Sequence, residues 1–297
     1  MPGQPKTLDE LMVGIAARGK IARRLTTKPP VLYHYTGAEG ALGIISTGRI
    51  WATDAAYLND PSETVYGRNL IKEQWAASKQ HVAVPDALDR LIGGFVGLLC
   101  RDMSDVYSTY LSCFSARKDS LSQWRAYGRS GTGFCLGFDP EGLARNGYGF
   151  VLLKVDYDRK SREQRLADFF NEIINDWSGI DPSDVGYLLP YYEWLESELL
   201  EFVVSFKNHA YEEEDEWRLV RLDLIKGLSS DLDFQAVRGR IIPHVISAGH
   251  ERLPLLSVIV GPGTAANGAD RSVRQALRKF GYPQTIEVSL SEVPYRP

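Results

Sequence analysis

Residues 210–220 read AYEEEDEWRLV, five consecutive acidic residues that lead directly into an apolar segment. An acidic run is typical of a solvated loop, whereas Trp-Arg-Leu-Val is typical of a strand. On a strand, alternate side chains share a face. The pattern therefore predicts a polar face with Glu214, Glu216 and Arg218 and a packed face with Asp215, Trp217 and Leu219. The alternative is a solvated sheet face that carries weak cross-strand ion pairs.

Outward from this stretch, short strands recur along the whole chain, with helices between groups of them. Strands are expected at 31–36, 49–53, 106–115, 131–139, 147–158, 233–246, 255–262 and 285–291, besides the acidic one. Helices are expected at 7–25, 38–48, 63–78, 85–103, 121–128, 161–177, 187–211 and 268–281. Strand and helix do not alternate throughout, which favours an α+β fold around mostly antiparallel sheets. We expect an N-terminal helix in 1–30 and one α+β catalytic-like domain in 31–297, with a helical insertion at about 160–211.

Composition excludes several classes of protein. The net charge of −4 gives no global basic field for nucleic acid. The cysteines, Cys100, Cys113 and Cys135, form no Cys-x-x-Cys pattern, which argues against a zinc site and suits a reducing compartment. Residues 1–10 lack the apolar region of a signal peptide, and the apolar run 91–100 is too short to span a bilayer. The expectation is a cytoplasmic protein with no membrane partner and no metal.

Residues 32–36, LYHYT, form a second polar cluster. Alternation places Leu32, His34 and Thr36 on one face of this strand and both tyrosines on the other. A strand histidine is more often packed in a core than bound to a ligand. The small residues that follow it, however, let a ligand approach the backbone closely.

A third cluster combines SCFS at 112–115 with SQWRAYG at 122–128. Trp124 and Tyr127 are spaced i, i+3 on a short helix, so they form one aromatic patch, suited to core packing or to stacking on a flat ring. The same region, 117–129, concentrates basic residues that could bind phosphates or be a solvated helix face: Arg117, Lys118, Arg125 and Arg129.

The motifs YHYT, YLNDPSE, SCFS with WRAYG, YEEEDEWRLV and SEVPYR occur in this order between residues 31 and 296. This set is similar to an uncharacterised bacterial domain family that is named only as a domain of unknown function. The order also resembles the ADP-ribosyltransferase superfamily, whose split β-sandwich surrounds NAD. That resemblance implies the same fold here.

The resemblance also implies roles for individual residues. NAD would be bound by His34, Tyr35, Thr36, Ser112, Ser115, Trp124 and Tyr127. The catalytic carboxylate would be Glu216 or Glu214, with Arg218 beside it, and the choice between the two stays open. Asn59, Asp60 and Glu63 would belong to a loop that closes over the cleft or simply forms a turn. We expect His34, a residue of 112–115, one of the two aromatic residues and Glu216 to line one cleft.

The function that this resemblance implies is NAD-dependent ADP-ribosyl transfer, a glycosyltransferase reaction that breaks the nicotinamide–ribose bond. A carboxylate near the ribose would stabilise the oxocarbenium character that develops there. The acceptor stays open among a protein, a nucleic acid, a small molecule and water, the last giving an NAD glycohydrolase. RNA 2′-phosphotransfer is a related alternative. A non-enzymatic nucleotide-sensing or interaction module of the same fold is the other.

Overall fold

The computed structural model describes residues 27–57, 62–99, 108–146, 149–177, 185–223, 231–237, 239–247, 252–264 and 268–295. The helix expected at 7–25 lies outside these residues. The chain divides into two compact units. The helical unit contains 1–27, 59–107 and 155–209, and the sheet unit contains 28–58, 108–154 and 210–297. The single domain with an insertion at about 160–211 stays a prediction.

The sheet unit contains ten strands among the described residues. They are β1 (Leu32–Thr36), β2 (Ile50–Asp54), β3 (Ser108–Ser115), β4 (Phe134–Phe138), β5 (Phe150–Lys154), β6 (Glu216–Asp223), β7 (Leu232–Val237), β8 (Arg240–Ser247), β9 (Leu255–Val260) and β10 (Glu287–Leu290). Among the described pairings of these ten strands, β9 and β10 pair in parallel and the others are antiparallel. The predicted α+β fold with a mostly antiparallel sheet is confirmed.

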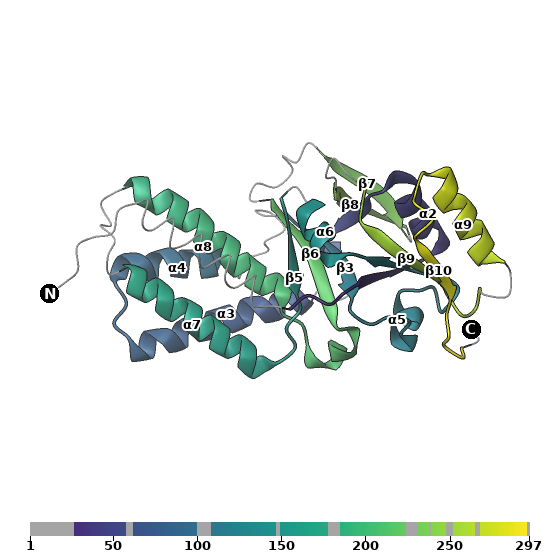
Figure 1. The fold of residues 1–297 in the computed structure, drawn as a ribbon. Coiled ribbons are helices and arrows are strands. Elements are labelled where there is room, and N and C mark those ends of the chain that lie inside the picture. Colours follow the sequence, from purple (N-terminus) through teal and green to yellow (C-terminus); the bar gives the residue numbers. More distant parts are fainter. Residues whose placement is uncertain are drawn as a thin grey trace. The chain divides into compact units, whose positions relative to one another are not determined.

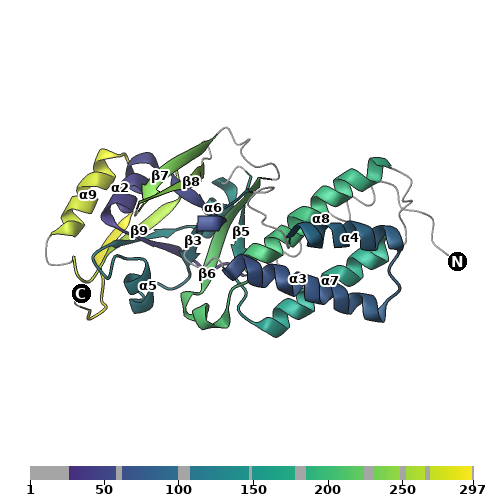
Figure 2. The ribbon, with the colours of Figure 1, turned by 180° about the vertical axis from the view of Figure 1, so that it is seen from behind.

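The sheet unit also contains helices α2 (Ala38–Thr47), α5 (Leu121–Ala126), α6 (Pro140–Asn146) and α9 (Ala269–Lys279). Figures 1 and 2 show α2 and α9 side by side, and α2 contacts β4 while α9 contacts β9 and β10. Ile44 and Ile45 of α2 share one apolar core with Val273 and Leu277 of α9. Gly48 follows the last residue of α2, and its φ of 68° is the left-handed conformation expected of a glycine after a helix.

The helical unit consists of α3 (Ser62–His81), α4 (Asp86–Leu99), α7 (Arg159–Trp177) and α8 (Val185–Ser205). Helix α3 packs against α4, α7 and α8, and the four helices form a bundle in Figure 2. Arg162 of α7 is buried there and donates to the carbonyl oxygens of Tyr157, Asp158 and Lys207, so its charge is well solvated by the backbone. No helix within the described ranges is long and apolar enough to cross a membrane.

The acidic run does not continue the strand, which corrects one prediction. A 3₁₀ helix, η3 (His209–Glu214), precedes β6, and Asp215 turns the chain with a φ of 43°. Glu214 is therefore outside the strand, and β6 begins at Glu216. Glu216 and Arg218 do share a face, as predicted, but that face is buried rather than solvated.

Candidate functional site

The sheet divides at β3, because two strands share one of its edges. On one edge, β6 pairs with β3 along its whole length. On the other edge, β2 pairs at Tyr110 and Leu111, whereas β1 pairs at Ser115. Two arms therefore leave β3: β1-β4-β9-β10 and β2-β8-β7. Helix α2 connects β1 to β2 and so joins the two arms.

A cavity of about 610 Å³ is lined by residues of both arms and of α2, and we call it the α2 hollow. Its polar wall includes His34 and Thr36 of β1, Thr53 of β2, Gln235 of β7 and Arg129, which follows α5. This volume lies within the range of about 300–1,000 Å³ that is usual for small-molecule sites. The structure thus brings the predicted residues His34 and Thr36 to one cavity.

His34 presents a hydrogen-bond acceptor to this cavity. Its Nδ1 lies 2.9 Å from the carbonyl oxygen of Cys113. A carbonyl only accepts, so Nδ1 carries the proton of the neutral ring and Nε2 accepts. Burial lowers the pKa of His34, although its contact with the Cys113 carbonyl favours the protonated form. The ring is therefore neutral at pH 7.

Trp51 is a residue of the α2 hollow that the sequence analysis missed. Its side chain is 52% exposed, and its ring lies 4.4 Å from the buried His244 ring between centroids. The ring is therefore held in place while much of its surface stays open to a flat ligand. Strand alternation in RIWAT (49–53) could have indicated this exposure, because it places Trp51 on the face opposite to Ile50 and Ala52. In the structure, Ile50 and Ala52 are buried and Trp51 is not.

Glu216 and Arg218 form a buried ion pair. Arg218 donates from Nε to Oε1 of Glu216 at 2.8 Å and from Nη2 to Oε2 at 3.2 Å. Both side chains are almost fully buried, with Arg218 2% and Glu216 6% exposed. The bidentate geometry offsets the large cost of removing two charges from water. This pair therefore fixes the beginning of β6.

Glu214 presents a more accessible carboxylate than Glu216. Its Oε1 accepts a hydrogen bond from the hydroxyl of Tyr127 at 2.9 Å. Its backbone oxygen accepts from Oγ of the buried Ser115 at 2.6 Å. Glu214 is only partly buried. Of the two candidate carboxylates, Glu214 is the one that a ligand could reach.

A second cavity of about 560 Å³ adjoins Tyr127, and we call it the α5 hollow. It is lined by Arg125, Ala126, Tyr127, Arg129, Ser130 and Thr132. Two of the four basic residues singled out in 117–129 therefore line a cavity. Arg117 instead lies 3.5 Å from Asp215 between Nε and Oδ2.

The aromatic patch separates into a core residue and a surface residue. Trp124 is fully buried; its ring meets that of Tyr35 edge-on at 4.9 Å, and its Nε1 donates to Asp119 at 2.7 Å. Trp124 therefore exposes no ring face for stacking in this structure. Tyr127 is 37% exposed and keeps that possibility.

Arg129 belongs to both hollows. It begins a left-handed turn with Ser130 and Gly131, at φ values of 50°, 51° and 83°. Such backbone costs on the order of 1 kcal/mol or more at each non-glycine residue. The side chain passes close to Gly37 at the start of α2, where an added Cβ would lie 3.1 Å from its Nε. This close approach brings Arg129 into the α2 hollow.

His34 and Glu216 do not line one cleft, which corrects the sequence expectation. Tyr33 is the register partner of Ser115, and Ser115 is the partner of Glu216, so these three share a face. His34 follows Tyr33 and faces the other way, with its ring 5.7 Å from that of Phe114. The sheet therefore separates the two predicted groups.

The remaining predicted residues are placed as follows. Ser112 is buried, and its Oγ donates to the carbonyl of Trp51 at 2.9 Å, so it joins β3 to β2. Asn59 and Asp60 lie outside the described residues. Glu63 is in α3, and its side chain also lies outside what the structure describes. No group of three or more His, Cys, Asp or Glu in the described ranges could hold a metal ion.

Comparison with known proteins adds a family of unknown activity. No curated protein and no solved structure matches the chain. The family described as "Protein of unknown function (DUF2971)" matches residues 123–219, about one third of the 297 residues. This segment includes the motif WRAYG and all but the last residue of YEEEDEWRLV. The match supports the predicted relation to an uncharacterised domain family.

Proposed function

We propose that this protein is an NAD-dependent, ADP-ribosyltransferase-like enzyme that cleaves the nicotinamide–ribose bond. One observation carries the proposal: Arg129 lines both the α2 hollow and the α5 hollow. NAD consists of two nucleosides joined by a pyrophosphate. A guanidinium binds phosphate oxygens in pairs. One NAD molecule with its pyrophosphate at Arg129 would extend into both cavities.

In this arrangement the adenosine end occupies the α2 hollow. The exposed ring surface of Trp51 would stack on the adenine. Nε2 of His34 accepts hydrogen bonds, so it suits a ribose hydroxyl. His34 then serves the substrate from the face opposite Glu216, and the two need not share a cleft.

The nicotinamide end would lie toward Tyr127 and Glu214. When the C1′–N bond breaks, its electron pair passes to the nicotinamide nitrogen and the ribose acquires oxocarbenium character. The Glu214 carboxylate, held by the Tyr127 hydroxyl, would stabilise that charge. The acceptor oxygen then bonds to C1′, and its proton passes to Glu214 or to solvent. The Glu216–Arg218 pair is a positioning element that holds the adjoining turn.

A second candidate is a non-enzymatic NAD sensor. It is favoured by the bidentate pairing of Glu216 with Arg218, because this pairing leaves Glu214 as the one carboxylate of the two that could stabilise a developing cation. Under this alternative, NAD binds in the same two hollows but is not broken. The two candidates differ in whether nicotinamide is released.

The test is incubation of the protein with NAD, with chromatographic measurement of free nicotinamide. We expect release by the parent protein and a loss of roughly 10²–10³-fold in Glu214→Gln, which keeps the shape of the side chain and removes its charge. Glu213→Gln, an exposed neighbour in η3, is the matched control and should be unchanged. NAD binding without release would instead select the sensor.

Arg129→Gln tests the placement of the pyrophosphate. We expect NAD affinity, measured by calorimetry, to fall by about tenfold or more, because charged hydrogen bonds to phosphate are lost. Arg145→Gln, on the exposed surface of α6, is the control. If the parent neither binds NAD nor releases nicotinamide, both candidate functions are rejected.

A further inference from the structure

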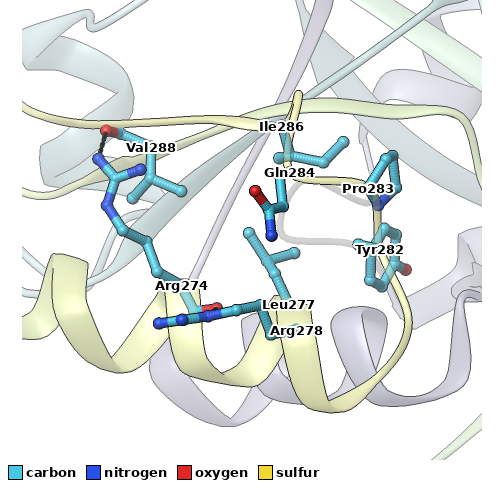
Figure 3. Close-up of a pocket in the computed structure, with 8 residues that line it drawn as sticks. All are labelled: Arg274, Leu277, Arg278, Tyr282, Pro283, Gln284, Ile286 and Val288. Carbon is cyan, nitrogen blue, oxygen red and sulfur yellow. Dashed lines mark hydrogen bonds between the residues drawn. The ribbon is translucent and has the colours of Figure 1, made fainter.

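We propose that the C-terminal half of α9 and the turn after it form a binding site for a small phosphorylated molecule. A cavity of about 290 Å³ lies there, lined by residues of α9, of the turn at 282–284 and of 286–288, and we call it the α9 cavity. Figure 3 shows its polar side chains, Arg274, Arg278 and Gln284, around an apolar floor. None of these residues lines either hollow assigned to NAD.

The helix sets the two arginines on one face. Arg274 and Arg278 are four residues apart, so their side chains lie on neighbouring turns of α9. Arg274 donates from Nη2 to the carbonyl of Val288 at 2.5 Å, which fixes its guanidinium beside β10. Arg278 donates from Nε to the carbonyl of Arg274 at 3.3 Å. Each guanidinium has five N–H donors, so most stay available to a ligand.

The charge of this site is not neutralised by neighbouring carboxylates. Within the described ranges, no Asp or Glu oxygen forms an ion pair with Arg274 or Arg278. Both side chains are exposed on a chain whose net charge is −4. Two like charges on adjacent helical turns repel one another, and an anion between them removes that repulsion. The site therefore favours an anionic ligand.

The donors and the size of the cavity specify the anion. Two guanidiniums and the Gln284 amide supply more donors than the two oxygens of a carboxylate need, whereas a phosphate monoester presents three terminal oxygens. The floor of Leu277 and Ile286 is apolar and buried. A cavity of this volume is at the small end of ligand sites, so it suits a phosphate with a short organic part rather than a dinucleotide.

Arg271 distinguishes a small phosphate from a nucleic-acid strand. It is exposed one turn before Arg274 on the same helix but does not line the cavity. A strand that tracks along α9 would contact Arg271 as well as Arg278, and its affinity would fall steeply with salt. The affinity of a ligand confined to the cavity would depend on Arg278 and not on Arg271.

Calorimetric titration of the full chain with ribose 5-phosphate and with inorganic phosphate tests the proposal. We expect millimolar binding of ribose 5-phosphate, weakened about tenfold by Arg278→Gln and less than about twofold by Arg271→Gln or Arg129→Gln. Gln284→Leu should also weaken it, which checks the site without changing a charge. The Arg129→Gln arm separates this site from the proposed NAD site, so either proposal can fail alone.

Two results would overturn the proposal. One is no binding of either probe by the parent protein at low salt. The other is binding of a single-stranded RNA oligonucleotide, tighter than that of ribose 5-phosphate, that Arg271→Gln and Arg278→Gln weaken equally. In the second case α9 is a nucleic-acid surface rather than a small-molecule site. A near-ultraviolet circular dichroism spectrum of each variant verifies that its tertiary packing is retained.

Discussion

Two carboxylates that are two residues apart in the sequence differ completely in their surroundings. Glu216 is buried and accepts hydrogen bonds from Nε and Nη2 of Arg218. Glu214 is partly exposed and accepts a hydrogen bond from the hydroxyl of Tyr127. The left-handed Asp215 between them produces this difference, because it ends a 3₁₀ turn just before the strand begins. In the proposed function, Glu214 is therefore the carboxylate that takes part in chemistry, and Glu216 has a positioning role.

Glu216→Gln should destabilise the protein, because it removes the negative charge that pairs with the buried guanidinium of Arg218. Loss of one partner from a buried pair costs on the order of 3 kcal/mol in the free energy of unfolding. Urea unfolding followed by circular dichroism measures this. Glu213→Gln should change stability by less than about 0.5 kcal/mol. A Glu216→Gln protein as stable as the parent would show that the pair contributes nothing to folding.

His34 should make stability depend on pH. Burial lowers its pKa in the folded state, so below the ordinary value of 6.5 the unfolded chain binds more protons. The contribution of His34 to the free energy of unfolding is present above pH 6.5. It is lost as the pH falls below this value, at a slope of at most about 1.4 kcal/mol per pH unit. In the His34→Asn variant, the side-chain amide of the asparagine still donates to the Cys113 carbonyl, but no group at this position titrates.

The measurement is urea unfolding of the parent and of His34→Asn at pH 7.5, 6.5 and 5.5. The free-energy advantage of the parent over the variant should shrink as the pH falls. A difference between the two proteins that is constant across this range would show that His34 does not titrate differently on folding.

At the scale of elements, the loop between α5 and β4 positions the proposed site because it lies very close to β1. A Cβ added at Gly133 would lie 2.3 Å from the carbonyl oxygen of Thr36 and 2.9 Å from that of Gly128. Backbone atoms cannot move aside as a flexible side chain does. Only glycine lets this loop carry Arg129 to the α2 hollow.

Gly133→Ala should therefore destabilise the protein by about 1–3 kcal/mol, as overpacking does, and should weaken NAD binding. The matched change is Gly94→Ala in α4, where an added Cβ meets no described atom within 4 Å. That change should stabilise by about 0.5–1 kcal/mol, because alanine is the better helix former. Thermal unfolding compares the two; a stabilised Gly133→Ala protein would contradict the close approach.

At the scale of the whole molecule, the buried charged side chains of the described residues are concentrated in the helical unit. Arg162, Asp176, Glu196, Glu201 and Lys207 are all less than 9% exposed in this unit. Burial raises the pKa of Glu196 from 4.5 to about 6. Its stability contribution is present below pH 4.5 and is lost as pH rises through 6, opposite in sign to that of His34.

Glu196→Gln should stabilise the helical unit by about 1 kcal/mol at pH 8 and not at pH 4, since the buried negative charge is removed. Hydrogen exchange should show slower opening of α8 with little change in β3. Glu193→Gln, exposed on the same helix, is the control. Equal protection gains in α8 and β3 would mean that the two units open together.

The sequence by itself determined the fold class and most of the elements, although it missed α6, and the single strand expected at 233–246 forms β7 and β8. Period-two alternation in LYHYT and in EWRLV predicted which side chains share a face, because a strand's geometry is local. The pairing of Glu216 with Arg218 on one face followed from the same rule. Glycine at position 48 marked the end of α2 for an equally local reason, the left-handed backbone.

Only the tertiary structure decided what those faces meet. Whether Glu216 is solvated, whether Trp124 is a platform or core, and on which face His34 lies relative to Glu216 all depend on register between strands far apart in the chain. A shift of one residue in the register of a strand turns every side chain of that strand to the opposite face of the sheet. No local sequence pattern fixes this register. Arg129 reaches both hollows for the same kind of reason: a left-handed turn and a glycine contact almost a hundred residues away in sequence bring it there.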